Sequence, residues 1–147
     1  MKIIGCGNPK RGDDDAGPLV IRRLQGHGIE AETVEGDTLD FLQACRQEDA
    51  VIVIDAVVTG APPGTVFHWD ADDLSLPHKP TISTHGLGLA ESIQLGRVLG
   101  CLPRRLQVFG IEAREFAVGA SMSQEVRKAA ETLADRIATQ MFHRALK

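Results

Sequence analysis

Short apolar runs alternate along the chain with segments in which apolar residues recur at helical spacing. The runs are rich in β-branched side chains, which is typical of strands buried in a sheet. They predict strands beginning at residue 3 and over residues 30–35, 50–58, 65–69 and 106–111. The segments with helical spacing predict helices from residue 18 to about 26 and over residues 38–44, 87–99 and 121–146. Residues 70–80 are polar and contain proline, which predicts a surface loop.

The order of these elements sets the fold class. Strands that alternate with helices favour a parallel or mostly parallel sheet with helices on both faces. The sequence therefore predicts an α/β three-layer sandwich with a twisted, mostly parallel sheet of about five strands. The strand at 65–69 is the exception, and we expect it to pair antiparallel with the strand before it. With no repeat or linker, residues 1–147 are predicted to form one domain.

Composition narrows the possible partners. The net charge of -4 argues against nucleic acid, because phosphate binding usually appears as an excess of basic residues. No apolar run approaches the roughly twenty residues that cross a bilayer, and no export signal opens the chain. We therefore expect a cytoplasmic monomer that contacts neither nucleic acid nor a membrane. Cys6, Cys45 and Cys101 are too widely spaced for a disulfide framework or a paired-cysteine metal site.

A glycine-rich loop and three consecutive acids follow the first apolar run. Glycine tolerates sharply turned backbone, so Gly5, Gly7 and Gly12 predict a shaped loop at the end of the strand. The loop carries acids 13–15 to the start of the next helix, where Pro18 suits the first turn and partial positive charge favours carboxylates. Each acid taken alone is more simply a solvated group or a helix cap. Replacing Asp13 is accordingly expected to remove a cap of about 1 kcal/mol.

Two further polar residues are predicted at the same edge of the sheet. Asp55 is the single charge in the run at 50–58, and an unpaired buried carboxylate needs a metal, a cation or several hydrogen-bond donors. Its simplest alternative role is to accept hydrogen bonds from the glycine-rich loop. His85 precedes a predicted helix among small residues. Ligands of open α/β sheets bind beyond the carboxyl ends of the strands. Two acids and His85 converging there would form a three-ligand site suited to zinc or nickel.

Three blocks of sequence carry these residues. They are Gly5-x-Gly7-Asn8-Pro9-x-Arg11-Gly12-Asp13-Asp14, then Ile54-Asp55-Ala56, then Ser83-Thr84-His85-Gly86-Leu87-Gly88-Leu89. In order and spacing they resemble the hydrogenase maturation proteases, over nearly the whole chain. The resemblance implies an endopeptidase that trims the C-terminal extension from the large subunit of a nickel-iron hydrogenase. It also implies that Asp14, Asp55 and His85 bind the metal and form the catalytic site.

The resemblance implies that the partner is a nickel-loaded large-subunit precursor. The three side chains would recognise the nickel of this precursor rather than hold a permanent ion, and other divalent cations can substitute for it. Two chemistries stay open. A bound metal can polarise the scissile carbonyl or lower the pKa of a water. Alternatively, Asp14 and Asp55 can share a proton and activate water as an aspartyl-type pair.

The sequence departs from the family pattern at several positions near the expected site. Asp15 stands where many relatives carry glycine. Glu35 and Asp37 alter an Asp-Gly-Gly-Thr-like turn that we expect beside the substrate channel.

Two other functions stay open. A nickel-sensing chaperone would use the same ligands without hydrolysis, although both carboxylates needed to activate water are present. A nucleotide-binding domain would use the loop at 5–12. That loop lacks a third glycine at dinucleotide-binding spacing, and the acids after it would repel a pyrophosphate.

Overall fold

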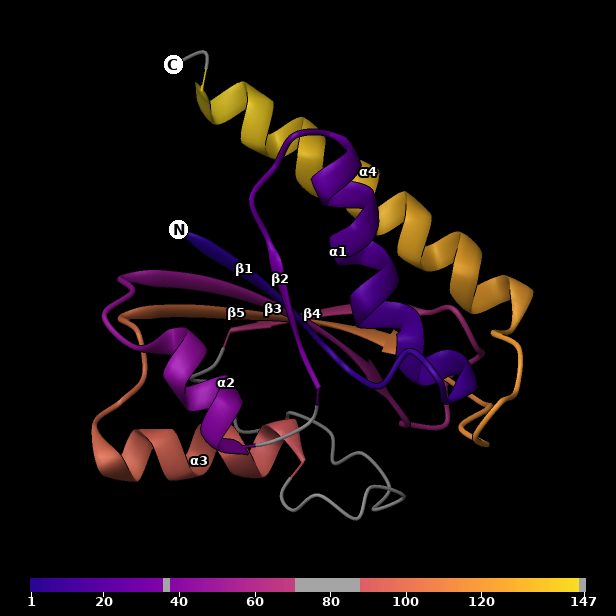
Figure 1. Ribbon diagram of the computed structural model, residues 1–147, viewed down its shortest axis with the longest axis horizontal. Helices are drawn as coiled ribbons and strands as arrows, with labels where there is room; N and C mark the ends of the chain where they lie inside the picture. Colours follow the sequence, from indigo (N-terminus) through magenta and orange to yellow (C-terminus); the bar gives the residue numbers. More distant parts are fainter. Residues whose placement is uncertain (36–37, 71–87, 146–147) are drawn as a thin grey trace.

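The computed structural model describes residues 1–35, 38–70 and 88–145. Within these residues the strands form a single sheet (Figure 1). The strands are β1 (Lys2–Cys6), β2 (Glu32–Val34), β3 (Ala50–Val57), β4 (Val66–Asp70) and β5 (Arg105–Glu112). The helices are the 3-10 turn η1 (Gly12–Asp15), α1 (Ala16–Gly26), α2 (Thr38–Cys45), α3 (Leu89–Leu99) and α4 (Gln124–Ala145). Each strand and helix expected from the sequence is present. The loop expected at 70–80 lies, apart from Asp70, outside the described residues.

The sheet has the order β2-β1-β3-β5-β4, and β4 alone among the described strands runs antiparallel to its neighbour. This confirms the predicted mostly parallel α/β sheet. The expected pairing of β4 with β3 is wrong, because β4 pairs with β5, with Val66 opposite Ile111. β3 lies between β1 and β5, so neither of its edges is open to another strand. The chain after β3 therefore crosses β5 to reach the outside of the sheet.

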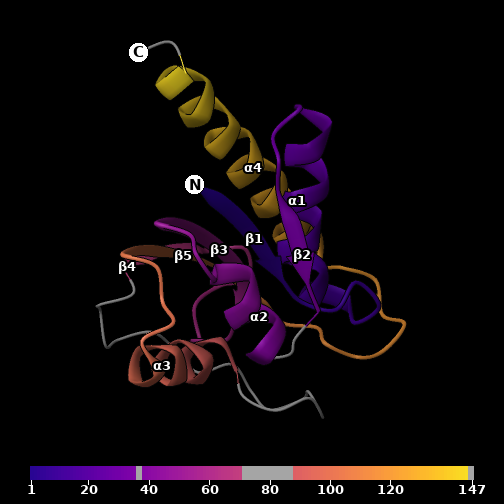
Figure 2. The ribbon, with the colours of Figure 1, turned by 60° about the vertical axis from the view of Figure 1, so that its left-hand side comes forward.

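Helices cover both faces of the sheet, α1 and α4 on one side and α2 and α3 on the other (Figure 1). The turned view separates the two pairs (Figure 2). Side chains alternate between the faces, so Ile3 and Ile54 pack in the core beneath α1 and α4, while Ile4 and Val53 pack towards α2 and α3. Burial on both faces explains why β3 is almost continuously apolar. No helix among the described residues is long and apolar enough to cross a bilayer.

The helix α4 begins later than the sequence predicts. The sequence predicts a start at residue 121, but the helix begins at Gln124 and Ser123 immediately precedes it. The backbone N–H of Ser123 donates to Oδ1 of Asp13 at 2.7 Å, across a separation of 110 positions. The acceptor at the start of α4 thus comes from the loop after β1, which no local pattern reveals.

Candidate active site

The carboxyl ends of β1 and β3 lie side by side at one edge of the sheet. Gly5 is paired with Ile54, so the loop after β1 and Asp55 begin next to one another. The first turn of α1 packs directly over these strands. A side-chain carbon on Gly17 would lie 2.5 Å from the carbonyl oxygen of Cys6 and 2.7 Å from that of Ile54. Only glycine allows this approach, which holds the acids before α1 at the edge that carries Asp55.

Asp14 lies in η1, between the glycine-rich loop and α1. Its side chain is buried, and its Oδ2 accepts a hydrogen bond from the backbone N–H of Asn8 at 2.9 Å. Gly7 has a φ of 144°, and a side chain there would overlap the carbonyl oxygen of Asp14. Glycine at position 7 therefore lets η1 fold back against the loop, and this places the Asp14 carboxylate beside Asn8.

Asp55 lies near the carboxyl end of β3 and is 3% exposed. Its Oδ1 accepts a hydrogen bond from the backbone N–H of Ala56 at 2.9 Å. Strand alternation puts its side chain on the same face as Val51 and Val53, which is the face covered by α2 and α3. A carboxylate this well buried has a fixed orientation, as a ligand or an acid–base group requires.

The structure brings two of the predicted site residues, Asp14 and Asp55, to the ends of adjacent strands. The third, His85, lies outside the described residues, as does Asp37. Glu35 follows β2 at the same edge and is exposed. Within residues 1–35, 38–70 and 88–145, no group of three or more His, Cys, Asp or Glu side chains is placed to hold a metal ion. The three-ligand site therefore stays a prediction that depends on His85.

Sequence reasoning missed the role of Asp13. This side chain is 0% exposed and does not cap the helix that follows it. Its Oδ2 accepts hydrogen bonds from the backbone N–H groups of Arg114 and Glu115, each at 2.9 Å, and from the Ser123 hydroxyl at 2.8 Å. Its Oδ1 accepts the N–H of Ser123 described above. Loss of these bonds exceeds the expected cost of a lost cap, since hydrogen bonds to charged groups are each worth about 1.5–3 kcal/mol.

Asp15, the third acid of the loop, binds Arg22 on the surface of α1. The Arg22 guanidinium donates to both carboxylate oxygens, at 3.0 and 2.8 Å. The three consecutive acids therefore have different environments. Asp13 is bound to the segment before α4, Asp14 to the glycine-rich loop, and Asp15 to an arginine of α1, the helix that follows it.

The environment of Asp13 predicts an acid-dependent stability. Burial alone would raise the pKa of the Asp13 carboxyl, but the backbone hydrogen bonds from Glu115, Ser123 and Arg114 and the bond from the Ser123 hydroxyl outweigh it. The pKa consequently lies below its usual value of 3.8. An acid of this kind stabilises the folded protein above its unfolded pKa and loses the effect as the pH falls through the folded one. We therefore expect Asp13→Asn to lower the free energy of unfolding at pH 7, and the difference from wild type to shrink below about pH 4.

Urea unfolding of both proteins at pH 7, 4 and 3 measures this difference. Asp135, whose pKa is lowered to about 2 by its hydrogen bond from Arg23, also loses its effect in acid. Wild type and Asp13→Asn lose this contribution of Asp135 equally, so it cancels in the difference between their free energies of unfolding. A difference that stays constant from pH 7 to pH 3 would contradict the prediction.

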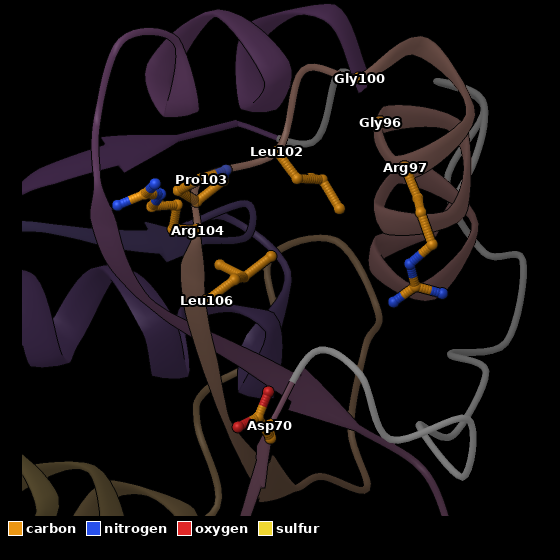
Figure 3. A pocket seen from close by; sticks show the side chains of 8 residues that line it. All are labelled: Asp70, Gly96, Arg97, Gly100, Leu102, Pro103, Arg104 and Leu106. Carbon is orange, nitrogen blue, oxygen red and sulfur yellow. The ribbon is translucent and has the colours of Figure 1, made fainter.

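A hollow of about 240 Å³ lies at the opposite edge of the sheet (Figure 3). It is lined by Asp70, Gly96, Arg97, Gly100, Leu102, Pro103, Arg104 and Leu106. These residues come from the end of β4, the last turns of α3, the segment between α3 and β5, and the start of β5. Because Asp14 and Asp55 lie at the carboxyl ends of the parallel strands, the hollow is not part of the candidate site.

Known proteins resemble this chain in sequence and in fold. The family model described as HycI, hydrogenase maturation protease, matches residues 20–140, a range that includes positions 55 and 85 but not 14. The hydrogenase expression/formation protein HupD of Thiocapsa roseopersicina is 27% identical over 133 residues, which are 86% of this chain and 60% of HupD. This chain thus spans less than two thirds of the length of that relative.

Two further matches come from Escherichia coli. The hydrogenase 2 maturation protease of strain K12 is 28% identical over 131 residues, covering 84% of this chain and 80% of that protein. The solved structure of the hydrogenase maturating endopeptidase HybD superposes with a TM-score of 0.71 at 21% identity, covering 97% of this chain and 93% of HybD. The HybD structure matches the α/β fold described above. Since the family model matches most of its length, this chain belongs to the hydrogenase maturation protease family, a family of endopeptidases.

Proposed function

We propose that the protein removes the C-terminal extension of a nickel-iron hydrogenase large-subunit precursor after nickel has been inserted. The observation that carries the proposal is the pair of buried carboxylates, Asp14 and Asp55, at the ends of two adjacent strands in a member of a peptidase family. Peptide hydrolysis needs a water to be activated and a leaving amine to be protonated, and carboxylates perform both tasks.

The proposed roles follow from how the two carboxylates are held. One oxygen of Asp14 is fixed by the N–H of Asn8, and one oxygen of Asp55 by the N–H of Ala56. Fixed orientation removes the entropy cost of aligning a reacting group with the substrate. We assign both residues to binding the nickel of the precursor and to activating the water. Nickel acts here as part of the substrate and selects the precursor that is ready for cleavage.

We assign the third ligand to His85, with support from the position of α3. This helix begins at Leu89, shortly after His85, and packs on the sheet face that carries Asp55. Its last residues border the hollow at the amino end of β5. A helix of 11 residues is about 16 Å long, so its first turn lies towards the other edge of the sheet, where Asp55 is found.

We propose that the reaction takes place in the cytoplasm and that the protein acts as a monomer. The three cysteines, Cys6, Cys45 and Cys101, form no disulfide, which agrees with a reducing compartment.

The decisive experiment is cleavage of purified precursor. The protein is incubated with nickel-loaded and with nickel-free large-subunit precursor, and intact masses are recorded over time. We expect the C-terminal peptide to be released from the nickel-loaded form alone. If the nickel-loaded precursor binds but keeps its full mass, the result would favour a nickel-sensing chaperone over a peptidase.

Metal binding provides a test that does not depend on cleavage. Titration calorimetry with Ni²⁺ is expected to show that Asp14→Asn and Asp55→Asn each weaken binding by more than about tenfold, because even groups that only orient a metal ligand contribute about 10–100-fold. Asp15→Asn is the matched control, since the Asp15 carboxylate binds Arg22 on α1. Equal affinities for the wild type and all three variants would contradict the assigned ligands.

A further inference from the structure

The loop that carries Asp14 is held by hydrogen bonds to the segment between β5 and α4. We call Asp13 together with its donors, Arg114, Glu115 and Ser123, the Asp13 clamp. The backbone adds to the same junction. The Asp13 N–H donates to the Glu115 carbonyl oxygen at 2.6 Å, and the Gly119 N–H donates to the Lys10 carbonyl oxygen at 2.8 Å. Two segments separated by 101 to 110 positions are thereby held together.

We propose that Asp13 is a positioning residue for Asp14, because its buried carboxylate fixes the turn that points the Asp14 side chain towards the site. This inference rests on the function proposed above for Asp14. The two residues are consecutive in the 3-10 turn η1, in which successive side chains point about 120° apart. Asp13 therefore points to the segment before α4 while Asp14 points to Asn8. Holding the first side chain sets the direction of the second.

The clamp requires a carboxylate. An ionised carboxylate presents acceptors only, and both Asp13 oxygens face N–H or O–H donors. An asparagine in its place has to turn an NH2 group towards one set of these donors. Asp13→Asn keeps the size of the side chain and removes part of the clamp, so it tests the positioning role with little change in volume.

A second buried carboxylate serves as a control that distinguishes the positioning role of Asp13 from a general contribution to stability. Glu112 is also buried, at 2% exposed, and its carboxylate accepts hydrogen bonds from the Thr59 N–H, the Thr59 hydroxyl and the Gly60 N–H. It therefore holds the loop after β3 much as Asp13 holds η1. Glu112→Gln loosens a buried carboxylate elsewhere without touching the Asp14 turn. Asp15→Asn controls for loss of a neighbouring negative charge.

The experiment combines amide hydrogen exchange with cleavage kinetics. The Asn8 N–H, which binds the Asp14 carboxylate, reports directly on the position of that carboxylate. In Asp13→Asn we expect its exchange to accelerate by about tenfold or more, and kcat on nickel-loaded precursor to fall about 10–100-fold. KM should change by less than kcat, since the orientation of a reacting group acts on the chemical step. Glu112→Gln and Asp15→Asn should keep Asn8 exchange and kcat near the wild-type values.

Three outcomes overturn the inference. One is unchanged Asn8 exchange in Asp13→Asn, and another is unchanged kcat in that variant while the wild type cleaves. The third is an equal fall of kcat in Glu112→Gln, which would assign the effect to lost stability. The wild type could also fail to cleave while Asn8 exchange accelerates in Asp13→Asn alone. This result would support the role of the Asp13 clamp in holding the Asp14 turn and would contradict the proposed peptidase function.

A milder variant covers the case in which Asp13→Asn does not fold. Ser123→Ala removes the hydroxyl that donates to Asp13 at 2.8 Å and leaves the backbone donors in place. It should change Asn8 exchange and kcat in the same direction by a smaller factor. Wild-type exchange at Asn8 in Ser123→Ala would then overturn the positioning role.

Discussion

Asp55→Asn is expected to lower kcat for precursor cleavage by about 10³-fold, within the range that acid–base groups contribute. The variant keeps a side-chain oxygen that can accept the hydrogen bond from the Ala56 N–H and loses the negative charge. Asp14→Asn and His85→Ala are expected to act equally strongly, since each removes one of the proposed ligands. Initial rates on nickel-loaded precursor measure the effect.

The fold of these variants is checked by circular dichroism and thermal unfolding. Asp55 is buried, so losing its charge can raise or lower the free energy of unfolding by a modest amount. A folded Asp55→Asn protein with wild-type kcat would remove Asp55 from the mechanism. Asp15→Asn should keep wild-type activity, because its carboxylate contacts Arg22 on α1.

Gly17→Ala is expected to destabilise the protein by about 3 kcal/mol, at the upper end of the cost of overpacking a well-filled core. The added methyl group would meet two backbone carbonyl oxygens, those of Cys6 and Ile54, which cannot move away as a flexible side chain does. The start of α1 must then lift from the sheet and move η1 away from Asp55. We therefore expect cleavage activity to fall together with the free energy of unfolding.

The same helix offers a control with the opposite sign. Gly26 is the last residue of α1, and a side-chain carbon there would meet nothing within 4 Å. Gly26→Ala should leave stability unchanged or raise it by about 0.4–1 kcal/mol, because alanine has less conformational freedom to lose on folding. Urea unfolding of both variants measures the two effects. Similar stabilities for Gly17→Ala and Gly26→Ala would contradict the close packing of α1 against β1 and β3.

The helices and strands of this fold were predictable because each depends on a local pattern of apolar residues. The apolar run at β3 needs burial on both faces, and the helices carry apolar residues at their own spacing. The pairing of β4 was not predictable in this way. Its partner β5 follows it by a long stretch of chain, and only the arrangement of the whole sheet excludes β3.

The same distinction between local patterns and long-range contacts applies to the candidate site. Asp14 and Asp55 were expected at one edge because ligands gather at the carboxyl ends of parallel strands, and the structure places both residues there. Asp13 was misjudged because its donors lie 101 to 110 positions away, beyond the reach of any helix-capping rule. The contribution of His85 stays a prediction.

The separation between Asp13 and its donors also bears on how the protein is made. Bringing together segments so far apart requires closure of a loop that includes most of the chain, and contacts of this kind form late in folding. A nascent chain on the ribosome holds η1 long before residues 114 to 123 emerge. A nascent chain that lacks these residues has no Asp13 clamp, and only the local hydrogen bond from the Asn8 N–H then holds the Asp14 carboxylate. Under the positioning role proposed for Asp13, the site is complete only after residues 114 to 123 have folded against η1.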